Sequence, residues 1–167
     1  MSLFPADIEA LVQRIVNDFT LRQLMIATAE SCTGGLIAGA LTEIPGSSAV
    51  VDRGFVTYTN EAKQQMIGVA AGTLDRHGAV SKETALEMAQ GALDHSRAAL
   101  AVAVTGIAGP GGGSDRKPVG LVHLAAKRRS GALLHREMRY GDIGRTEIRL
   151  ATVKTALEML LEISQAE

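Results

Sequence analysis

The sequence predicts a layered α/β domain built on a mixed β-sheet. Short apolar runs, typical of buried strands, alternate with longer segments in which apolar residues recur at helical spacing. Two strand-like segments near the C-terminal end are joined by a short basic link that contains glycine, which is typical of an antiparallel hairpin. A length of 167 residues fits one domain, so we expect residues 1–167 to fold as a single unit.

The first part of the chain is expected to alternate between helices and buried strands. Pro5 suits a first helical turn, and Asn60 is a good residue for the start of a helix. Gly54 stands inside a predicted strand and indicates a bulge or a point of close approach. The expected elements are a helix with apolar residues from 8 to 19, a strand over 24–29, a helix over 33–42, a strand over 50–58 and a helix over 61–67.

The second part of the chain adds the central strand, the hairpin and a long final helix. The run over residues 99–104 is entirely apolar, as expected of a strand buried on both faces. The expected elements are a loop with a short helical turn over 68–80, a helix capped by Ser81, a strand over 99–104, the hairpin strands over 119–126 and 133–140, and a helix over 144–163.

Composition and charge exclude several classes of protein. The chain has 17 Lys and Arg against 18 Asp and Glu, and only 3% aromatic residues, which argues against a nucleic-acid partner. A single Cys excludes an internal disulfide framework and fits a reducing cytosol. The four histidines lack metal-ligand spacing, so we expect no metal site. No targeting segment and no apolar run of membrane-spanning length is present, so we expect a cytoplasmic protein without a membrane partner.

Four segments that follow predicted strands hold most of the small polar residues and glycines. In open α/β sheets, binding sites form at the carboxyl ends of the strands. The segments are residues 30–35, 58–63, 105–114 and 141–145. We therefore expect these four segments to converge on one site.

The segment after the first strand offers backbone donors for an anion. A strand that enters a glycine-containing turn and then a helix exposes N–H groups, and these can hold an oxyanion or a phosphate. The alternative is a tight strand-to-helix turn in which Thr33 only caps the helix.

Two cations are predicted in first helical turns, where the helix dipole disfavours positive charge. For Lys63, the dipole and partial burial would lower the pKa of the amine and make it a general base for a nearby hydroxyl. For Arg145, the position suggests an anionic ligand. The alternative in both cases is an ordinary solvated side chain.

Several motifs resemble, in the same order, those of the C-terminal domain of the competence/damage-inducible protein CinA family. They are the sequences at residues 28–35, 45–48, 54–63, 77–81, 105–112 and 117–120. The resemblance extends from about Ile8 to Ile163, and the N-terminal domain of two-domain members is absent, which indicates the stand-alone form. It implies a three-layer α/β/α sandwich with a mixed sheet, no cofactor, and a homodimer or larger homo-oligomer.

The resemblance also implies an activity on a small molecule. Water would convert the carboxamide of nicotinamide mononucleotide into a carboxylate, and release nicotinate mononucleotide and ammonia, in pyridine nucleotide salvage. Amide hydrolysis needs a nucleophile, a base, an oxyanion hole and a proton for the leaving ammonia. We expect Ser48 or Ser31 as nucleophile, Lys63 as base, and Tyr58 as a proton relay or orienting group.

Ser48 is the preferred nucleophile, because its turn enters the strand that leads to Tyr58 and it has no evident capping duty. Cys32 is a rival, because its place just before a helix would lower its pKa. The amides of residues 33–35 are expected to hold the oxyanion or a substrate oxygen, and Arg145 the phosphate. The residues expected to bind substrate are Glu30, Cys32, Thr33, Gly34, Gly35, Thr105, Gly106, Gly109 and Arg145.

Other functions are compatible with the same pocket. A non-catalytic regulatory module linked to competence or DNA damage would bind the nucleotide without releasing ammonia. A hydrolase of another amide or of a phosphate ester would share the loops. Direct binding of nucleic acid is disfavoured by the near-zero net charge of −1.

Overall fold

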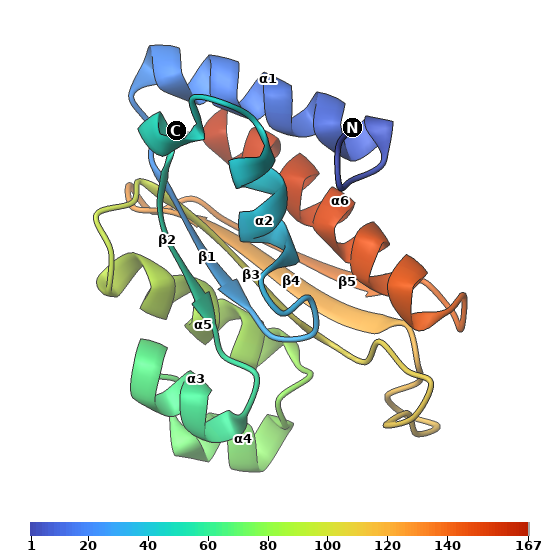
Figure 1. The fold of residues 1–167 in the computed structure, drawn as a ribbon. Coiled ribbons are helices and arrows are strands. Elements are labelled where there is room, and N and C mark those ends of the chain that lie inside the picture. Colours follow the sequence, from blue (N-terminus) through green and yellow to red (C-terminus); the bar gives the residue numbers. More distant parts are fainter. Residues whose placement is uncertain (167) are drawn as a thin grey trace.

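The computed structural model of the protein describes residues 1–166 and shows a β-sheet covered by helices on both faces (Figure 1). The strands are β1 (Ile26–Glu30), β2 (Val51–Val56), β3 (Leu100–Gly106), β4 (Leu121–Arg128) and β5 (Leu133–Arg139). The helices are α1 (Ala6–Arg22), α2 (Leu36–Glu43), α3 (Asn60–Ile67), α4 (Ala71–His77), α5 (Lys82–Asp94) and α6 (Arg145–Ser164), with a short 3₁₀ helix, η1 (Ser47–Ala49).

The sheet has the strand order β2-β1-β3-β4-β5. Strand β1 pairs in parallel with β2 and β3, whereas β4 pairs antiparallel with β3 and with β5. The predicted mixed sheet and its C-terminal hairpin are thus confirmed. Because β1, β2 and β3 are parallel, their carboxyl ends lie at one edge of the sheet.

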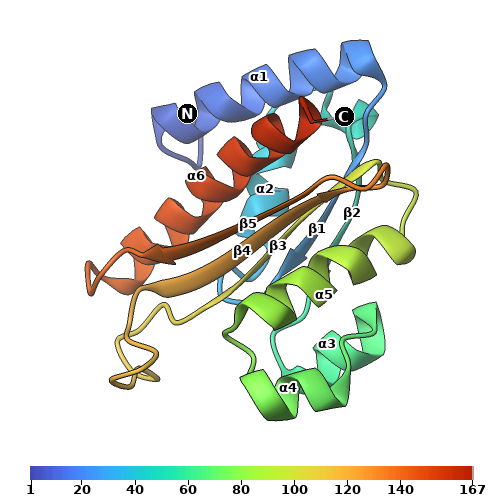
Figure 2. The same ribbon diagram turned by 180° about the vertical axis from the view of Figure 1, so that it is seen from behind.

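The two faces of the sheet carry side chains of different size. Along β3, Leu100, Val102 and Val104 pack into the core under α1, α2 and α6, while Ala101 and Ala103 face α5. Successive strand residues point to opposite faces, so this alternation makes a thick core on one side and a close helix contact on the other. Figure 2 shows the same layers from behind, with α3, α4 and α5 on the side opposite α1 and α6. The expected α/β/α sandwich is confirmed.

Several element boundaries differ from those predicted, among the strands as well as the helices. Helix α2 begins at Leu36, because Gly34 and Gly35 take positive φ values of 58° and 104° and keep the chain in turns. Helix α3 is capped by Thr59, whose hydroxyl accepts a hydrogen bond of 3.0 Å from the Ala62 N–H. Residues 71–77 form a complete helix, α4, where only a short turn was expected.

Gly54 marks a close approach, as predicted, and the bulge lies next to it. A Cβ at Gly54 would sit 2.8 Å from the Thr28 hydroxyl oxygen and 3.2 Å from the Cβ of Ala38 in α2. The pairing of β1 with β2 skips Asp52, which is therefore the extra residue of the bulge.

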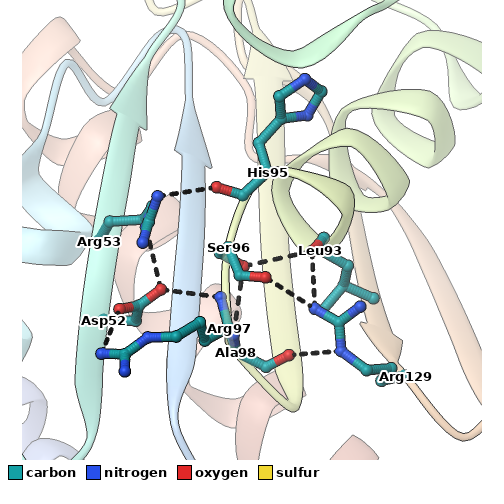
Figure 3. A network of polar contacts seen from close by, with 8 residues as sticks. All are labelled: Asp52, Arg53, Leu93, His95, Ser96, Arg97, Ala98 and Arg129. Carbon is teal, nitrogen blue, oxygen red and sulfur yellow. Dashed lines mark hydrogen bonds and ion pairs between the residues drawn. The ribbon is translucent and has the colours of Figure 1, made fainter.

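The bulged Asp52 ties β2 to the connection between α5 and β3 (Figure 3). Its carboxylate accepts hydrogen bonds from the backbone N–H of Arg97 at 3.0 Å and from Nε of Arg53 at 2.9 Å. These contacts, the backbone bond first among them, hold the pKa of Asp52 below its ordinary value. Nearby, the Arg129 guanidinium donates to the carbonyls of Leu93, Ser96 and Ala98 at the end of α5.

Within residues 1–166, none of the helices combines the length and the apolar character that crossing a membrane requires.

Candidate active site

A cavity of about 280 Å³ lies beyond the carboxyl ends of β1 and β3. The order β2-β1-β3 reverses the direction of chain winding at this point, and open α/β sheets bind ligands at such a reversal. Each of the four segments predicted to converge contributes to the wall. The lining residues are Ser31, Cys32, Tyr58, Lys63, Ala79, Val80, residues 105–109, Gly111, Gly112 and Arg145.

Ser31 and Lys63 meet in this cavity. Ser31 follows β1 directly and is held there by its N–H, which donates to the Val104 carbonyl at 3.1 Å. Lys63 extends from α3, is 1% exposed, and places Nζ 3.0 Å from Oγ of Ser31. Its Nζ also donates to the Thr57 carbonyl oxygen at 2.8 Å.

Burial makes the Lys63 amine a base near neutral pH. Removal from water disfavours the ammonium and lowers the pKa of Lys63 to about 8. A neutral amine can donate to the Thr57 carbonyl and still accept the Ser31 proton with its lone pair. The arrangement can therefore deprotonate a serine for attack on a carbonyl carbon.

Ser48 does not lie near Lys63, so the preference for it was wrong. It is exposed in η1, before β2, and lines a separate cavity with residues of α1 such as Val16 and Leu21. Strand β2 runs from Val51 to Val56, and six strand residues span roughly 20 Å. Ser48 therefore lies at the opposite edge of the sheet from the amine.

Cys32 lines the cavity, but its expected activation was also wrong. Burial raises the pKa of the Cys32 thiol to about 12, and the Glu30 carboxylate adds to the rise. Because α2 begins only at Leu36, the thiol is not placed at the first helical turn that would have lowered its pKa. Cys32 is thus a buried, neutral part of the wall.

Glu30 and residues 33–35 shape the turn and are not part of the cavity wall, contrary to the expectation that they bind substrate. The Glu30 carboxylate accepts hydrogen bonds from the Thr33 hydroxyl at 2.7 Å and from the N–H groups of Ile37 and Ala38 at 2.8 and 3.0 Å. It therefore accepts from two of the first N–H groups of α2, although the N-cap residue of the helix is Gly35. The Gly34 N–H donates to the Ser31 carbonyl at 3.0 Å, so this amide is not free to hold an oxyanion.

The remaining predicted residues line the cavity, and the exposed Tyr58 and Arg145 form its rim. Tyr58 is 59% exposed, and its hydroxyl accepts a hydrogen bond from Nη2 of Arg145 at 3.2 Å. Nη1 of Arg145 donates to the Gly109 carbonyl at 2.7 Å. The Thr105 hydroxyl donates to the Ala79 carbonyl at 2.7 Å and joins the end of β3 to the loop before α5. Gly106 and Gly109 belong to the wall, as expected.

Arg149 was not identified from the sequence. It lies in the second turn of α6 and donates from Nε to the Cys32 carbonyl and from Nη2 to the Thr33 carbonyl, both at 3.1 Å. Arg145 and Arg149 are four residues apart, so they share one face of the helix. The four-residue spacing from Arg145 was the sequence signal that could have identified Arg149.

Among residues 1–166, no three or more His, Cys, Asp and Glu side chains are grouped so as to hold a metal ion.

The family model described as the CinA C-terminal domain matches residues 8–164. The chain belongs to the CinA C-terminal domain family. A member from Escherichia coli strain K12, named nicotinamide-nucleotide amidohydrolase PncC, is 47% identical over 156 residues, which cover 93% of each chain. A competence-damage inducible protein of Caldicellulosiruptor bescii is 46% identical over 158 residues. This chain covers 95% of its own length in that match but spans only 38% of that longer protein.

Solved structures of CinA proteins have the same fold. The structure of competence/damage inducible protein CihA from Agrobacterium tumefaciens is 74% identical, covers 99% of this chain and 100% of its own, and has a TM-score of 0.98. A CinA superfamily protein from Escherichia coli is 35% identical, covers 98% of this chain and 94% of its own, and has a TM-score of 0.89.

Proposed function

We propose that this chain hydrolyses the carboxamide of nicotinamide mononucleotide to nicotinate mononucleotide and ammonia, with Ser31 as nucleophile and Lys63 as base. The observation that carries the proposal is the 3.0 Å contact between Nζ of Lys63 and Oγ of Ser31 inside the cavity. Relatives that match over 93% of their length are named nicotinamide-nucleotide amidohydrolase, which supports this substrate.

The first half of the reaction forms an ester. The neutral Lys63 amine takes the Ser31 proton as Oγ attacks the carboxamide carbon, and a tetrahedral oxyanion results. The C–N bond then breaks, and the Lys63 ammonium returns its proton to the departing nitrogen, so ammonia leaves. The acyl group remains on Oγ of Ser31.

The second half repeats these steps with water. Lys63, neutral again, takes a proton from water as the oxygen attacks the ester carbon. The bond between that carbon and Oγ breaks, Ser31 regains its proton from Lys63, and the pyridine carboxylic acid is released. The sum is one amide and one water converted into one acid and one ammonia.

The oxyanion is best placed against the backbone N–H that directly follows the nucleophile, that of Cys32, which belongs to the cavity wall. Such an amide is a preorganised donor for a charge that develops only in the transition state. This choice drops the expected amides of residues 33–35, because these residues lie outside the cavity wall and the Gly34 N–H is engaged with the Ser31 carbonyl.

Arg145 is proposed to bind the substrate phosphate, because its guanidinium lies at the rim between Tyr58 and Gly109. The loop over residues 105–112, rich in glycine, would lie along the ribose and ring. Tyr58, exposed and held by Arg145, is proposed to orient the substrate or relay the leaving proton.

Other expectations stay predictions. They are the single-domain organisation over residues 1–167, the homodimer or larger homo-oligomer, the cytoplasmic location, and the absence of nucleic-acid and membrane partners.

The proposal is tested by incubating the purified protein with nicotinamide mononucleotide and measuring ammonia and nicotinate mononucleotide. Free nicotinamide, a dinucleotide and an unrelated amide serve as comparison substrates. Stoichiometric ammonia and acid from the mononucleotide are expected. Tight binding of the mononucleotide without ammonia would contradict the proposal and favour a regulatory module.

A further inference from the structure

The first two turns of α6 carry Arg145 and Arg149 on one face, and each holds a different part of the cavity. Arg145 reaches Tyr58 and Gly109 at the rim, and Arg149 reaches the turn that follows β1. Cations are disfavoured at a helix N-terminus, so these arginines sit against the helix dipole. Their contacts must offset that cost.

Arg149 binds two successive carbonyls with one guanidinium. Nε donates to Cys32 and Nη2 to Thr33, each at 3.1 Å, and the side chain is half-buried. The planar guanidinium presents its donors in a fixed fork, so it fixes the orientation of the two peptide planes relative to each other. An ammonium offers one nitrogen and does not impose the same geometry.

A carbonyl that is fixed in direction also fixes the direction of the N–H in the same peptide, and this links Arg149 to the nucleophile. In a trans peptide, the carbonyl and the N–H of the next residue point in opposite directions. The Thr33 carbonyl faces Arg149, and the N–H of the same peptide, that of Gly34, does point back to the Ser31 carbonyl at 3.0 Å. By the same geometry, the Ser31 carbonyl, which accepts from Gly34, makes the N–H of its own peptide, that of Cys32, point the opposite way, away from Gly34.

We propose that Arg149 is a positioning residue of the hydrolysis, which fixes the turn so that Ser31 faces Lys63 and the Cys32 N–H faces the developing oxyanion. This inference rests on the proposed function. Arg149 is not among the residues that line the cavity, so it acts through the turn and does not touch substrate.

The proposal predicts that the two arginines of α6 affect different kinetic constants. Loss of Arg149 is expected to lower kcat by about 10²-fold, the size of effect seen when an oxyanion donor is lost, with KM changed by less than about threefold. Loss of Arg145, at the rim, is expected to raise KM instead. If Arg149 had only a structural role, its loss would lower the free energy of unfolding without a selective loss of kcat.

The test compares R149A, R149K and the matched control K154A in the ammonia-release assay, with thermal unfolding of each. Lys154 is a cation on the same helix, and its ion pair, at 2.8 Å, is with Asp7 of α1 and not with the turn. K154A is expected to keep the kcat of the wild type, R149K to be intermediate, and millimolar guanidinium to restore part of the kcat of R149A.

Three outcomes overturn the inference: a wild-type kcat in R149A, a wild-type kcat in R149K, or a loss in R149A that appears only in KM. If R149A does not fold, R149K decides, since its kcat must fall while KM holds. Wild-type activity is measured in the same assay, so failure of the proposed function shows as no ammonia from the unaltered chain, and is distinct from failure of the Arg149 inference.

Discussion

At the scale of single residues, the proposed mechanism depends on the protonation of Lys63, because only a neutral amine can take the proton of Ser31. The amine is 1% exposed, and its pKa is lowered to about 8 because burial disfavours the charged form. A base must be neutral to accept the serine proton, so the reactive fraction of the protein grows as the pH rises through this value.

We therefore predict that kcat/KM rises with pH and levels off above about 8. Between pH 7 and 9, the neutral fraction of such an amine increases about tenfold, so the rate should increase by a similar factor. The measurement is the pH profile of ammonia release. A flat profile over this range, or a rate that falls as the pH rises from 7 to 9, would contradict the role of Lys63 as base.

The lowered pKa of Lys63 also affects the free energy of unfolding, and this effect can be measured without an activity assay. The pKa of Lys63 is about 8 in the folded chain and 10.5 for a free lysine, so the unfolded state binds more protons between these values. The penalty for burying the ammonium is full below pH 8 and vanishes as the pH approaches 10.5. Stability of the wild type should therefore rise relative to Lys63→Met across this window.

This stability difference is measured by denaturant unfolding of both proteins at several pH values. The hydrogen bonds that Lys63→Met removes contribute at every pH, so the slope of the difference isolates the titration of the amine. A difference that does not change between pH 8 and 10.5 would show that the amine titrates alike in both states.

The nucleophile illustrates what a sequence can predict about single residues. Both Ser31 and Ser48 stand in small polar turns beside strands, and a local pattern does not say at which edge of the sheet a turn lies. The edge follows from strand direction: Ser31 comes after β1 and Ser48 before β2. Arg149 was missed for another reason, because its partners are backbone carbonyls, which every sequence supplies.

At the scale of elements, α3 must be held firmly, because it carries Lys63. The carbonyl of Ile67, the last residue of α3, lies against Gly91 of α5, where an added Cβ would come within 1.9 Å of the oxygen. The contact needs glycine, because no side chain fits between the two helices.

Gly91→Ala is predicted to push α3 away from α5, lower the free energy of unfolding by about 3 kcal/mol and reduce kcat through displacement of Lys63. Gly39→Ala in α2 is the matched control, since its Cβ would lie 3.7 Å from Phe4, an ordinary contact. The control should be neutral or stabilising by up to about 1 kcal/mol. Equal stability of the two variants in thermal unfolding would contradict the contact.

The elements were predicted best where the apolar pattern is strong, and their bounds were predicted less well where glycines set the backbone. The uninterrupted apolar run of β3 and the long apolar stripe of α6 gave correct types and nearly correct bounds. The start of α2 was placed too early, because the positive φ of Gly34 and Gly35 is a backbone property that apolar spacing does not reveal.

At the scale of the whole molecule, the candidate active site and the Asp52 hydrogen-bond network lie at opposite edges of the sheet. The cavity lies at the carboxyl ends of the parallel strands, and the Asp52 network lies where β2 begins (Figure 3). Stability can therefore be changed at one edge with little effect on chemistry at the other.

Asp52→Asn should lower stability at pH 7 by about 1 kcal/mol, because a charge-assisted hydrogen bond becomes a neutral one. The pKa of Asp52 is held below 3.8, so its stabilisation is present above that pH and is lost as the pH falls through the folded value. The two proteins should converge in acid, with kcat unaltered at neutral pH. Asp75→Asn, at an exposed position of α4, is the control for removal of a surface charge.

The ammonia-release rate of Ser31→Ala, measured beside Ser48→Ala and Cys32→Ala with nicotinamide mononucleotide as substrate, tests the central claim most directly. Ser31→Ala should lose at least about 10³-fold in kcat, while the other two variants stay within about threefold of the wild type. Retained turnover in Ser31→Ala, or its loss in Ser48→Ala alone, would contradict the assignment of Ser31 and Lys63 as the catalytic pair.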